Sequence, residues 1–213
     1  MFELVIFDCD GVLVDSEPVG NRVLAGLLSE IGLPTSTEEA VRDYMGRSVE
    51  SCLEIIEAKL GRPVPAEFTE TLTRRTFAAL RDELQAVPGI ESALDRIALP
   101  ICVASSGPHD KMRLTLGLTG LLPRFEGRLF SATDVGRGKP SPDLFLHAAA
   151  SLDVAAERCA VVEDSVLGVR AGQAAGMTVF GFASRSDPRA LAAAGARVFR
   201  DMASLPELLA ASL

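Results

Sequence analysis

The chain has 213 residues, of which 48% are hydrophobic, and a formal net charge of −8. This length accommodates one full α/β core with a smaller second domain, and the composition excludes a disordered or fibrous protein. The negative charge, without a basic run, opposes binding to nucleic acid. No apolar run reaches the roughly 18 residues of a membrane helix, and the acidic Glu3 does not fit a signal peptide. We therefore expect a cytoplasmic protein with neither nucleic acid nor membrane as a partner.

Cysteine and histidine leave little scope for chemistry. The four cysteines are scattered without CxxC spacing, so the sequence indicates neither a zinc site nor a disulfide framework. Only two histidines are present, which disfavours histidine-based metal sites and charge relays. Carboxylates must therefore carry the chemistry.

The apolar run 4–7 leads directly into two acids, Asp8 and Asp10, and then Gly11. Four apolar residues bounded by a glycine turn predict a strand that is buried on both faces. Side chains two positions apart on an extended chain point the same way, so both carboxylates can face one crevice at the carboxyl end of the strand. Two like charges at that spacing require a cation between them.

The next part of the chain contains only helical patterns, at about 17–31, 37–44, 48–60 and 66–84. We expect residues 16–85 to form a helical cap domain inserted after the first strand. Residues 1–15 and 86–213 then form the catalytic core. Asp15 or Ser16 can cap the first inserted helix, and this cap is the preferred interpretation of Asp15.

Strand and helix patterns alternate over the rest of the chain. Strands are predicted at 100–104, 128–131, 159–162, 177–180 and 196–199, and helices at about 89–98, 108–117, 142–151, 166–174, 187–194 and 204–212. Such alternation is typical of an α/β protein with a doubly wound parallel sheet.

Polar residues follow two of these predicted strands. Ser105, Ser106 and Gly107 precede a helix, where hydroxyl and N–H groups bind anions, although the serines alone also fit helix caps. Glu163 and Asp164 end a strand, so they face the same edge as Asp8 and Asp10. Hard oxygen ligands in that number favour Mg²⁺, and the alternative is an N-cap with an acidic first turn.

Lys139 lies in a loop rich in glycine and proline, residues 136–143. A single lysine in such a loop is usually a solvated surface charge. The flanking prolines stiffen the loop, however, and stiffness suits a cation that must stay in one place. Both interpretations stay open from this segment alone.

In this order along the chain, the signals resemble the four motifs of the haloacid dehalogenase-like superfamily, in the branch of small phosphatases related to β-phosphoglucomutase. The resemblance covers essentially the whole chain and implies a Rossmann-like core with a cap. The implied roles are nucleophile for Asp8, general acid/base for Asp10, motif-two hydroxyl for Ser105 and motif-three lysine for Lys139. It also implies Mg²⁺ as the cofactor, with the metal site made by Asp8, Asp10, Glu163 and Asp164.

The resemblance implies a phosphatase that acts on a small phosphorylated metabolite, a sugar or sugar-acid phosphate, through an aspartyl-phosphate. The expected substrate-binding residues are Gly11, Arg47, Ser48, Ser106, Gly107 and His109. A surface charge accounts for Arg47 nearly as well. We expect a monomer, because a capped monomer needs no second subunit to close its site.

Two alternatives stay open. A phosphomutase is disfavoured because Gly20 and Val49 stand where the mutase pattern has a histidine and an arginine. A non-catalytic protein that binds a phosphometabolite is disfavoured because no motif residue is lost.

Overall fold

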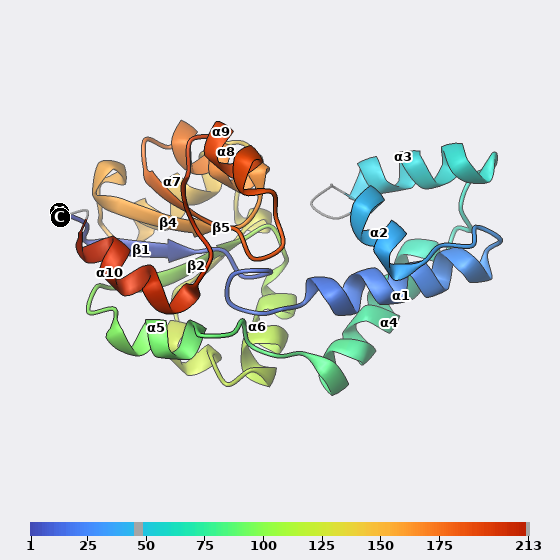
Figure 1. Cartoon of the computed structure of the whole chain (residues 1–213), viewed down its shortest axis with the longest axis horizontal. Helices are drawn as coiled ribbons and strands as arrows, with labels where there is room; N and C mark the ends of the chain where they lie inside the picture. Colours follow the sequence, from blue (N-terminus) through green and yellow to red (C-terminus); the bar gives the residue numbers. More distant parts are fainter. Residues whose placement is uncertain (45–48, 212–213) are drawn as a thin grey trace. The chain divides into compact units, whose positions relative to one another are not determined.

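The computed structural model describes residues 1–44 and 49–211 of the chain (Figure 1). These residues form two compact units. One unit holds Met1–Asp15 and Gln85–Leu213, and the other holds Ser16–Leu84. Among the residues described, no helix combines the length and the apolar character needed to span a bilayer.

A parallel sheet forms the middle of the first unit. Within the described residues its six strands lie in the order β3-β2-β1-β4-β5-β6. The strands are β1 (Leu4–Phe7), β2 (Ile101–Ser105), β3 (Leu129–Ser131), β4 (Cys159–Glu163), β5 (Thr178–Phe182) and β6 (Arg197–Phe199). The chain runs outward from β1 to β3 and then returns to β4 on the other side of β1. This confirms the predicted doubly wound fold and puts its topological switch point between β1 and β4.

Helices cover both faces of the sheet (Figure 1). One face carries α5 (Ile90–Arg96), α6 (His109–Leu118) and α10 (Leu205–Ala210), and the other carries α7 (Asp143–Ser151), α8 (Val166–Ala174) and α9 (Pro188–Ala193). Short 3₁₀ helices lie at Leu122–Phe125, Ala132–Asp134, Ala156–Arg158 and Met202–Ser204.

The side chains of β1 are buried on both sides of the sheet, as a central strand requires. Ile6 belongs to the same apolar cluster as Phe145 of α7. Phe7 points to the opposite face and meets Phe125 edge to face, with 6.3 Å between ring centroids. The residues that follow β1 are therefore anchored by a strand that is packed from both faces.

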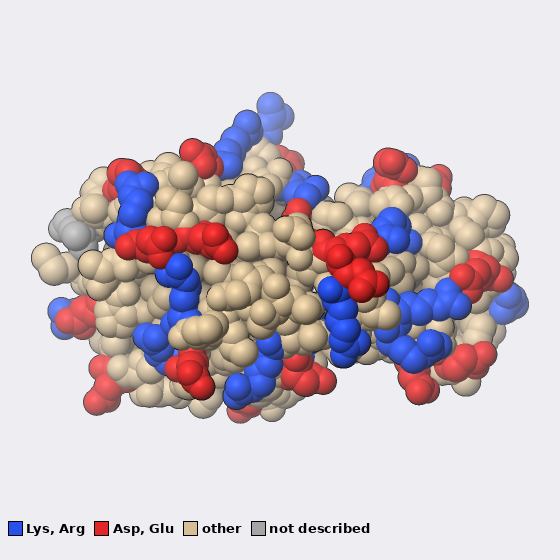
Figure 2. Space-filling view, turned by 90° about the horizontal axis from the view of Figure 1, so that it is seen from below, with Lys and Arg blue, Asp and Glu red and all other residues tan. Residues whose placement is uncertain are grey.

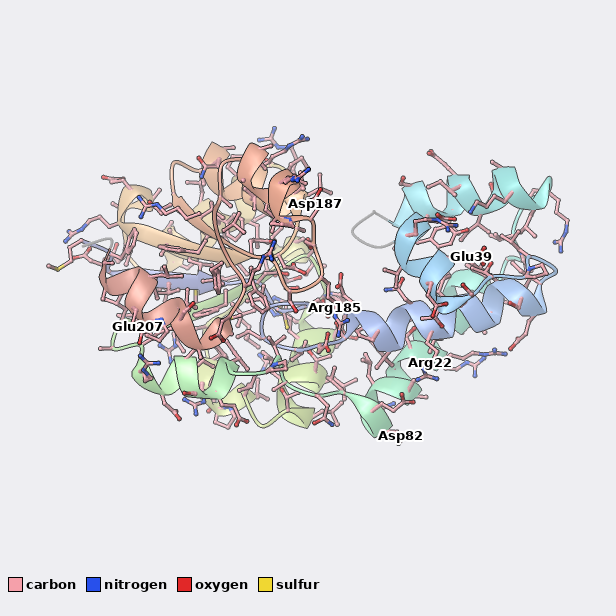
Figure 3. The ribbon with its side chains drawn as sticks, viewed as in Figure 1. Arg22, Glu39, Asp82, Arg185, Asp187 and Glu207 are labelled. Carbon is pink, nitrogen blue, oxygen red and sulfur yellow. The ribbon has the colours of Figure 1, made fainter. Side chains whose placement is uncertain are left out.

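The second unit consists of helices, α1 (Glu17–Glu30), α2 (Thr37–Tyr44), α3 (Val49–Leu60) and α4 (Phe68–Glu83). Its apolar core includes Leu28 of α1, Ile56 of α3 and Phe68 of α4. Exposed ion pairs such as Arg22–Glu83, at 2.6 Å, join α1 to α4. Arg22 is labelled in Figure 3. Figure 2 shows acidic and basic side chains interspersed on one face of the molecule. Exposed ion pairs contribute little to stability, so the apolar core holds this unit together.

Backbone hydrogen bonds join the two chain segments where the first unit ends. Asp15 N–H donates to the Gln85 carbonyl at 2.9 Å, and Val87 N–H donates to the Leu13 carbonyl at 3.0 Å. Of the two predicted cap candidates, Ser16 is the N-cap residue of α1, so the preference for Asp15 is wrong. Asp15 instead binds Arg185, whose guanidinium donates to both carboxylate oxygens at 3.1 and 2.7 Å (Figure 3).

Candidate active site

Asp8 and Asp10 lie in a tight turn directly after β1. Asp8 N–H donates to the Val162 carbonyl of β4 at 2.9 Å, which extends the β1–β4 ladder by one residue. The turn closes where Gly11 N–H donates to the Val14 carbonyl at 2.8 Å. Gly11 has a φ of +78°, in the left-handed region that glycine adopts without strain. Asp8 and Asp10 are therefore held at the carboxyl edge of the sheet, beside the switch point.

Lys139 connects three strands at this edge. Its ammonium donates to Asp8 Oδ1 at 2.7 Å, to the Ala104 carbonyl of β2 at 3.0 Å and to Glu163 Oε1 of β4 at 2.6 Å. The Lys139 side chain is only 5% exposed, so the structure does not place it as a solvated surface charge. The Lys139 ammonium also lies over the Phe145 ring, 4.9 Å from its centroid.

Glu163 is fully buried and accepts from the same Lys139 ammonium as Asp8. Its other oxygen, Oε2, accepts from Ser165 N–H at 3.0 Å and from the Ser165 hydroxyl at 2.9 Å. Both Glu163 oxygens are therefore engaged by protein donors. A β-carbon at Gly168 would overlap the Glu163 carboxylate, so the glycine at that position leaves room for it.

Three buried carboxylates gather at this edge of the sheet. Asp8, Glu163 and Asp164 each offer an oxygen, and these atoms lie within 4.8 Å of one another. Asp164 lies directly over Gly11, where a β-carbon would overlap its carboxylate. Carboxylate oxygens are the ligands that Mg²⁺ prefers, so the chemistry of this cluster agrees with a magnesium site.

Burial and neighbouring charges shift the pKa values of the two central groups. Burial raises the pKa of Asp8 to about 7; the Lys139 ammonium opposes this rise, and Glu163 adds to it. Burial disfavours the Lys139 cation, but Asp8 and Glu163 outweigh burial and raise the pKa of the Lys139 ammonium. Lys139 is thus held as a cation. A second cation beside Asp8 would favour the ionised carboxylate.

Ser105 is the last residue of β2, and Gly107 lies in the short loop between this strand and α6. Ser105 is 2% exposed, and its hydroxyl oxygen accepts from Gly107 N–H at 3.1 Å. The Gly107 carbonyl accepts from the Ser131 hydroxyl at 2.8 Å, which ties the loop to the end of β3. The N-cap residue of α6 is Pro108, so neither Ser105 nor the exposed Ser106 caps that helix.

His109 begins α6 and binds a carboxylate of the same unit. Its Nε2 lies 2.8 and 2.9 Å from the two Asp134 oxygens. Asp134 also accepts from Ser131 N–H at 2.8 Å, so His109 is part of the network that supports the Ser105–Gly107 loop. The other two predicted substrate contacts, Arg47 and Ser48, lie outside the described residues.

Lys111 is a site residue that the sequence analysis missed. Its ammonium donates to Asp10 Oδ2 at 2.7 Å, across 101 residues of sequence. Lysines are common on exposed helix surfaces, and only the fold shows that this one reaches the acid after β1. One sequence signal could have indicated this role. Lys111 lies in the first turn of the helix that follows Ser105, six residues after that serine.

A parallel doubly wound sheet with a carboxylate cluster and a buried lysine at its switch point is the arrangement of an α/β enzyme whose ligand binds at the carboxyl edge of the sheet. The chain belongs to the haloacid dehalogenase-like hydrolases, whose family model matches residues 2–176. This confirms the family expected from the four motifs. Within the family the protein is a phosphatase.

The comparisons extend over nearly the whole chain. The chain is 36% identical over 207 residues to the 6-phosphogluconate phosphatase of Escherichia coli, covering 97% of this chain and 94% of that protein. A crystal structure of a hydrolase of this family from Deinococcus radiodurans, with bound phosphate and sodium, superposes with a TM-score of 0.85 at 32% identity and covers 99% of this chain and 96% of that one. A protein from Thermotoga maritima that has been assigned as a β-phosphoglucomutase superposes with a TM-score of 0.82 at 28% identity, with 100% of both chains covered.

Proposed function

We propose that this phosphatase hydrolyses a small sugar or sugar-acid phosphate through a covalent aspartyl-phosphate on Asp8. The observation that carries the proposal is the contact of the Lys139 ammonium with both Asp8 and Glu163, beside Asp164. A buried nucleophile that faces a phosphate dianion needs fixed positive charge, and Lys139 supplies it. The phosphate in the related Deinococcus structure agrees with an anion as the ligand of this fold.

The two acids of the β1 turn divide the reaction between them. In the first step the Asp8 carboxylate attacks phosphorus, the bond to the leaving oxygen breaks, and Asp10 gives that oxygen a proton. In the second step Asp10 takes a proton from water as the water oxygen attacks phosphorus. The Asp8–phosphorus bond breaks, and inorganic phosphate leaves.

Other residues act on the oxygens of the transferring group. Lys139, the Ser105 hydroxyl and backbone N–H groups of the turn after Asp8 stabilise the negative charge of the phosphoryl oxygens. The carboxylates of Asp8 and Asp164 and the backbone carbonyl of Asp10 would hold Mg²⁺. When bound there, Mg²⁺ supplies a Lewis acid that neutralises charge on the phosphoryl group. Glu163, whose two oxygens already accept from Lys139 and Ser165, positions the lysine.

The substrate class rests on the relatives. The Escherichia coli protein is a 6-phosphogluconate phosphatase, and two further relatives are hexitol phosphatases. The substrates in their names are phosphorylated polyhydroxy compounds. We therefore propose that the substrate of the present chain is also a phosphorylated polyhydroxy compound. We also assign selection of the leaving group to the helical unit, residues 16–84, acting as the cap that the family resemblance implies.

Sugar phosphomutase activity is the second candidate, favoured by the similarity to the Thermotoga protein. Gly20 lies in α1, and a β-carbon there would meet nothing within 4 Å, so the helix itself does not require glycine at this position. Val49, the other position at which the mutase pattern differs, is 55% exposed. Neither residue can bind a second phosphate through its side chain, which favours hydrolysis.

One assay separates these functions. Purified wild-type protein and Asp8→Asn are incubated with Mg²⁺ and a panel of sugar and sugar-acid phosphates, including β-glucose-1-phosphate with its bisphosphate activator. We expect phosphate release by the wild type and none by the folded Asp8→Asn protein. Isomerisation that outruns phosphate release would favour the mutase, and undiminished release by Asp8→Asn would overturn the mechanism.

A further inference from the structure

Asp10 is held by a lysine of its own. The Lys111 ammonium lies 2.7 Å from Asp10 Oδ2, and each side chain is 27% exposed. Lys139 makes the corresponding contact to Asp8 at 2.7 Å. Each of the two acids after β1 thus has a different ammonium partner, contributed by a different segment of the chain.

The local packing directs the Lys111 side chain to this contact. Lys111 Cδ lies 3.4 Å and Asp10 Oδ2 lies 3.9 Å from the point where a β-carbon of Gly107 would stand. A β-carbon at 107 would be in van der Waals contact with both groups, so the Lys111 stem and the Asp10 carboxylate lie together beside Gly107. The Lys111 carbonyl accepts from the Thr115 hydroxyl one turn later at 3.0 Å, and that hydroxyl oxygen lies 3.8 Å from Cys9 Sγ. This face of α6 is therefore packed against the Cys9–Asp10 segment.

An ion pair as exposed as this one adds little to stability. The Lys111–Asp10 pair has another consequence, because it fixes the direction of the Asp10 carboxylate, which must reach the leaving oxygen. A misplacement of catalytic groups by about 1 Å can lower the rate roughly 100-fold.

We propose that Lys111 is a positioning residue for Asp10, holding its carboxylate where it gives a proton to the leaving oxygen. This inference rests on the proposed function, in which Asp10 is the proton shuttle. Lys111 acts through Asp10 and does not itself touch the reacting phosphorus.

The proposal makes the effect of Lys111 depend on the leaving group. An alkoxide leaving group needs the proton from Asp10, whereas a dinitrophenolate leaves without one. The value of kcat/KM reports the steps up to the departure of the leaving group, so it isolates the proton transfer in question. A purely structural role for Lys111 would lower kcat/KM for both kinds of ester equally.

The experiment compares wild type, Lys111→Met and Arg113→Met with an alkyl phosphate and with dinitrophenyl phosphate, all with Mg²⁺. Arg113 is an exposed cation of the same helix and serves as the matched control. For Lys111→Met we expect kcat/KM to fall about 100-fold with the alkyl ester and less than about 3-fold with the dinitrophenyl ester. For Arg113→Met we expect the ratio of kcat/KM for the alkyl ester to kcat/KM for the dinitrophenyl ester to equal that of the wild type.

The ratio of the two esters in one preparation does not depend on how much enzyme is folded. If Lys111→Met yields no soluble protein, Lys111→Gln gives the same comparison. Equal losses with both esters, or no loss with either, would overturn the role of Lys111. A wild type that releases phosphate from neither ester would overturn the proposed function instead, so the two failures are distinguishable.

Discussion

The Glu163 carboxylate occupies the space in which a β-carbon of Gly168 would stand. Gly168 lies in the first turn of α8, where alanine would ordinarily favour the helix. We expect Gly168→Ala to displace Glu163 and, with it, the Lys139 ammonium that Glu163 holds. The expected result is a loss of about 1–3 kcal/mol of unfolding free energy and a fall in kcat of about 100-fold. Urea unfolding and phosphate release measure the two effects.

The matched control is Gly26→Ala in α1. A β-carbon at Gly26 would meet nothing within 4 Å, so alanine there should leave stability equal or higher and activity unchanged. If Gly168→Ala behaved like Gly26→Ala, Glu163 would not be fixed as the structure shows.

Lys139 separates two buried carboxylates, and this makes its removal costly. Lys139→Met leaves Asp8 and Glu163 without their shared cation, and breaking a buried pair typically costs about 3–5 kcal/mol. We expect Lys139→Met combined with Glu163→Gln to be less destabilised than the sum of the single variants, with a coupling of about 1–3 kcal/mol. Urea unfolding of the wild type, the two single variants and the double variant, without added divalent cation, measures this double-mutant cycle.

Arg22 and Glu83 form an exposed pair at 2.6 Å and provide the comparison cycle. The substitutions Arg22→Met and Glu83→Gln should be nearly additive, because exposed pairs are screened by solvent. If the losses of unfolding free energy in Lys139→Met and Glu163→Gln were also additive, this would contradict the buried ion pair between Lys139 and Glu163.

The fold was largely predictable because its signals are local. The runs that become β1 and β4 are continuously apolar and end in acids or glycine, and the helical patterns between strands have ordinary lengths. The predicted helix at 166–174 agrees with α8 at Val166–Ala174, and the run 177–180 with β5 at Thr178–Phe182. The short 3₁₀ helices were not predicted, since three or four residues carry no periodicity.

The site was predictable where its residues directly follow strands, and not where they reach it from elsewhere. Asp8 and Glu163 end neighbouring strands, so topology alone brings them together. Lys111 reaches Asp10 from a helix, and Arg185 reaches Asp15 from a loop 170 residues away. Those contacts depend on side-chain direction and tertiary packing, which a single sequence does not show.

Binding of Mg²⁺ should depend on pH through Asp8. Burial raises the pKa of Asp8 to about 7, above its ordinary value of 3.8. Without added Mg²⁺, the stability of the protein therefore falls as the pH rises from about 3.8 to about 7, because the folded protein holds the Asp8 proton more tightly than the unfolded chain does. Because Mg²⁺ binds the ionised carboxylate, we expect its apparent affinity to fall from pH 8 to pH 6, with protons released on binding.

Calorimetry in two buffers with different ionisation enthalpies measures that proton release. Asp8→Asn, in which residue 8 does not titrate, should show less release at pH 6 and weaker binding. An affinity for Mg²⁺ that is constant between pH 6 and pH 8 in the wild type would contradict the assignment of Asp8 as a ligand.

The covalent intermediate on Asp8 is the central claim and can be observed directly. Asp10→Asn lacks the base for the second step, so it should hold the phosphoryl group after reacting with an ester that has a good leaving group, such as dinitrophenyl phosphate. Acid quench and peptide mass spectrometry should find one phosphoryl group per chain, on the peptide that contains Asp8. A phosphoryl group on another residue, or release of dinitrophenol by this variant with no covalent adduct at any time, would contradict the account.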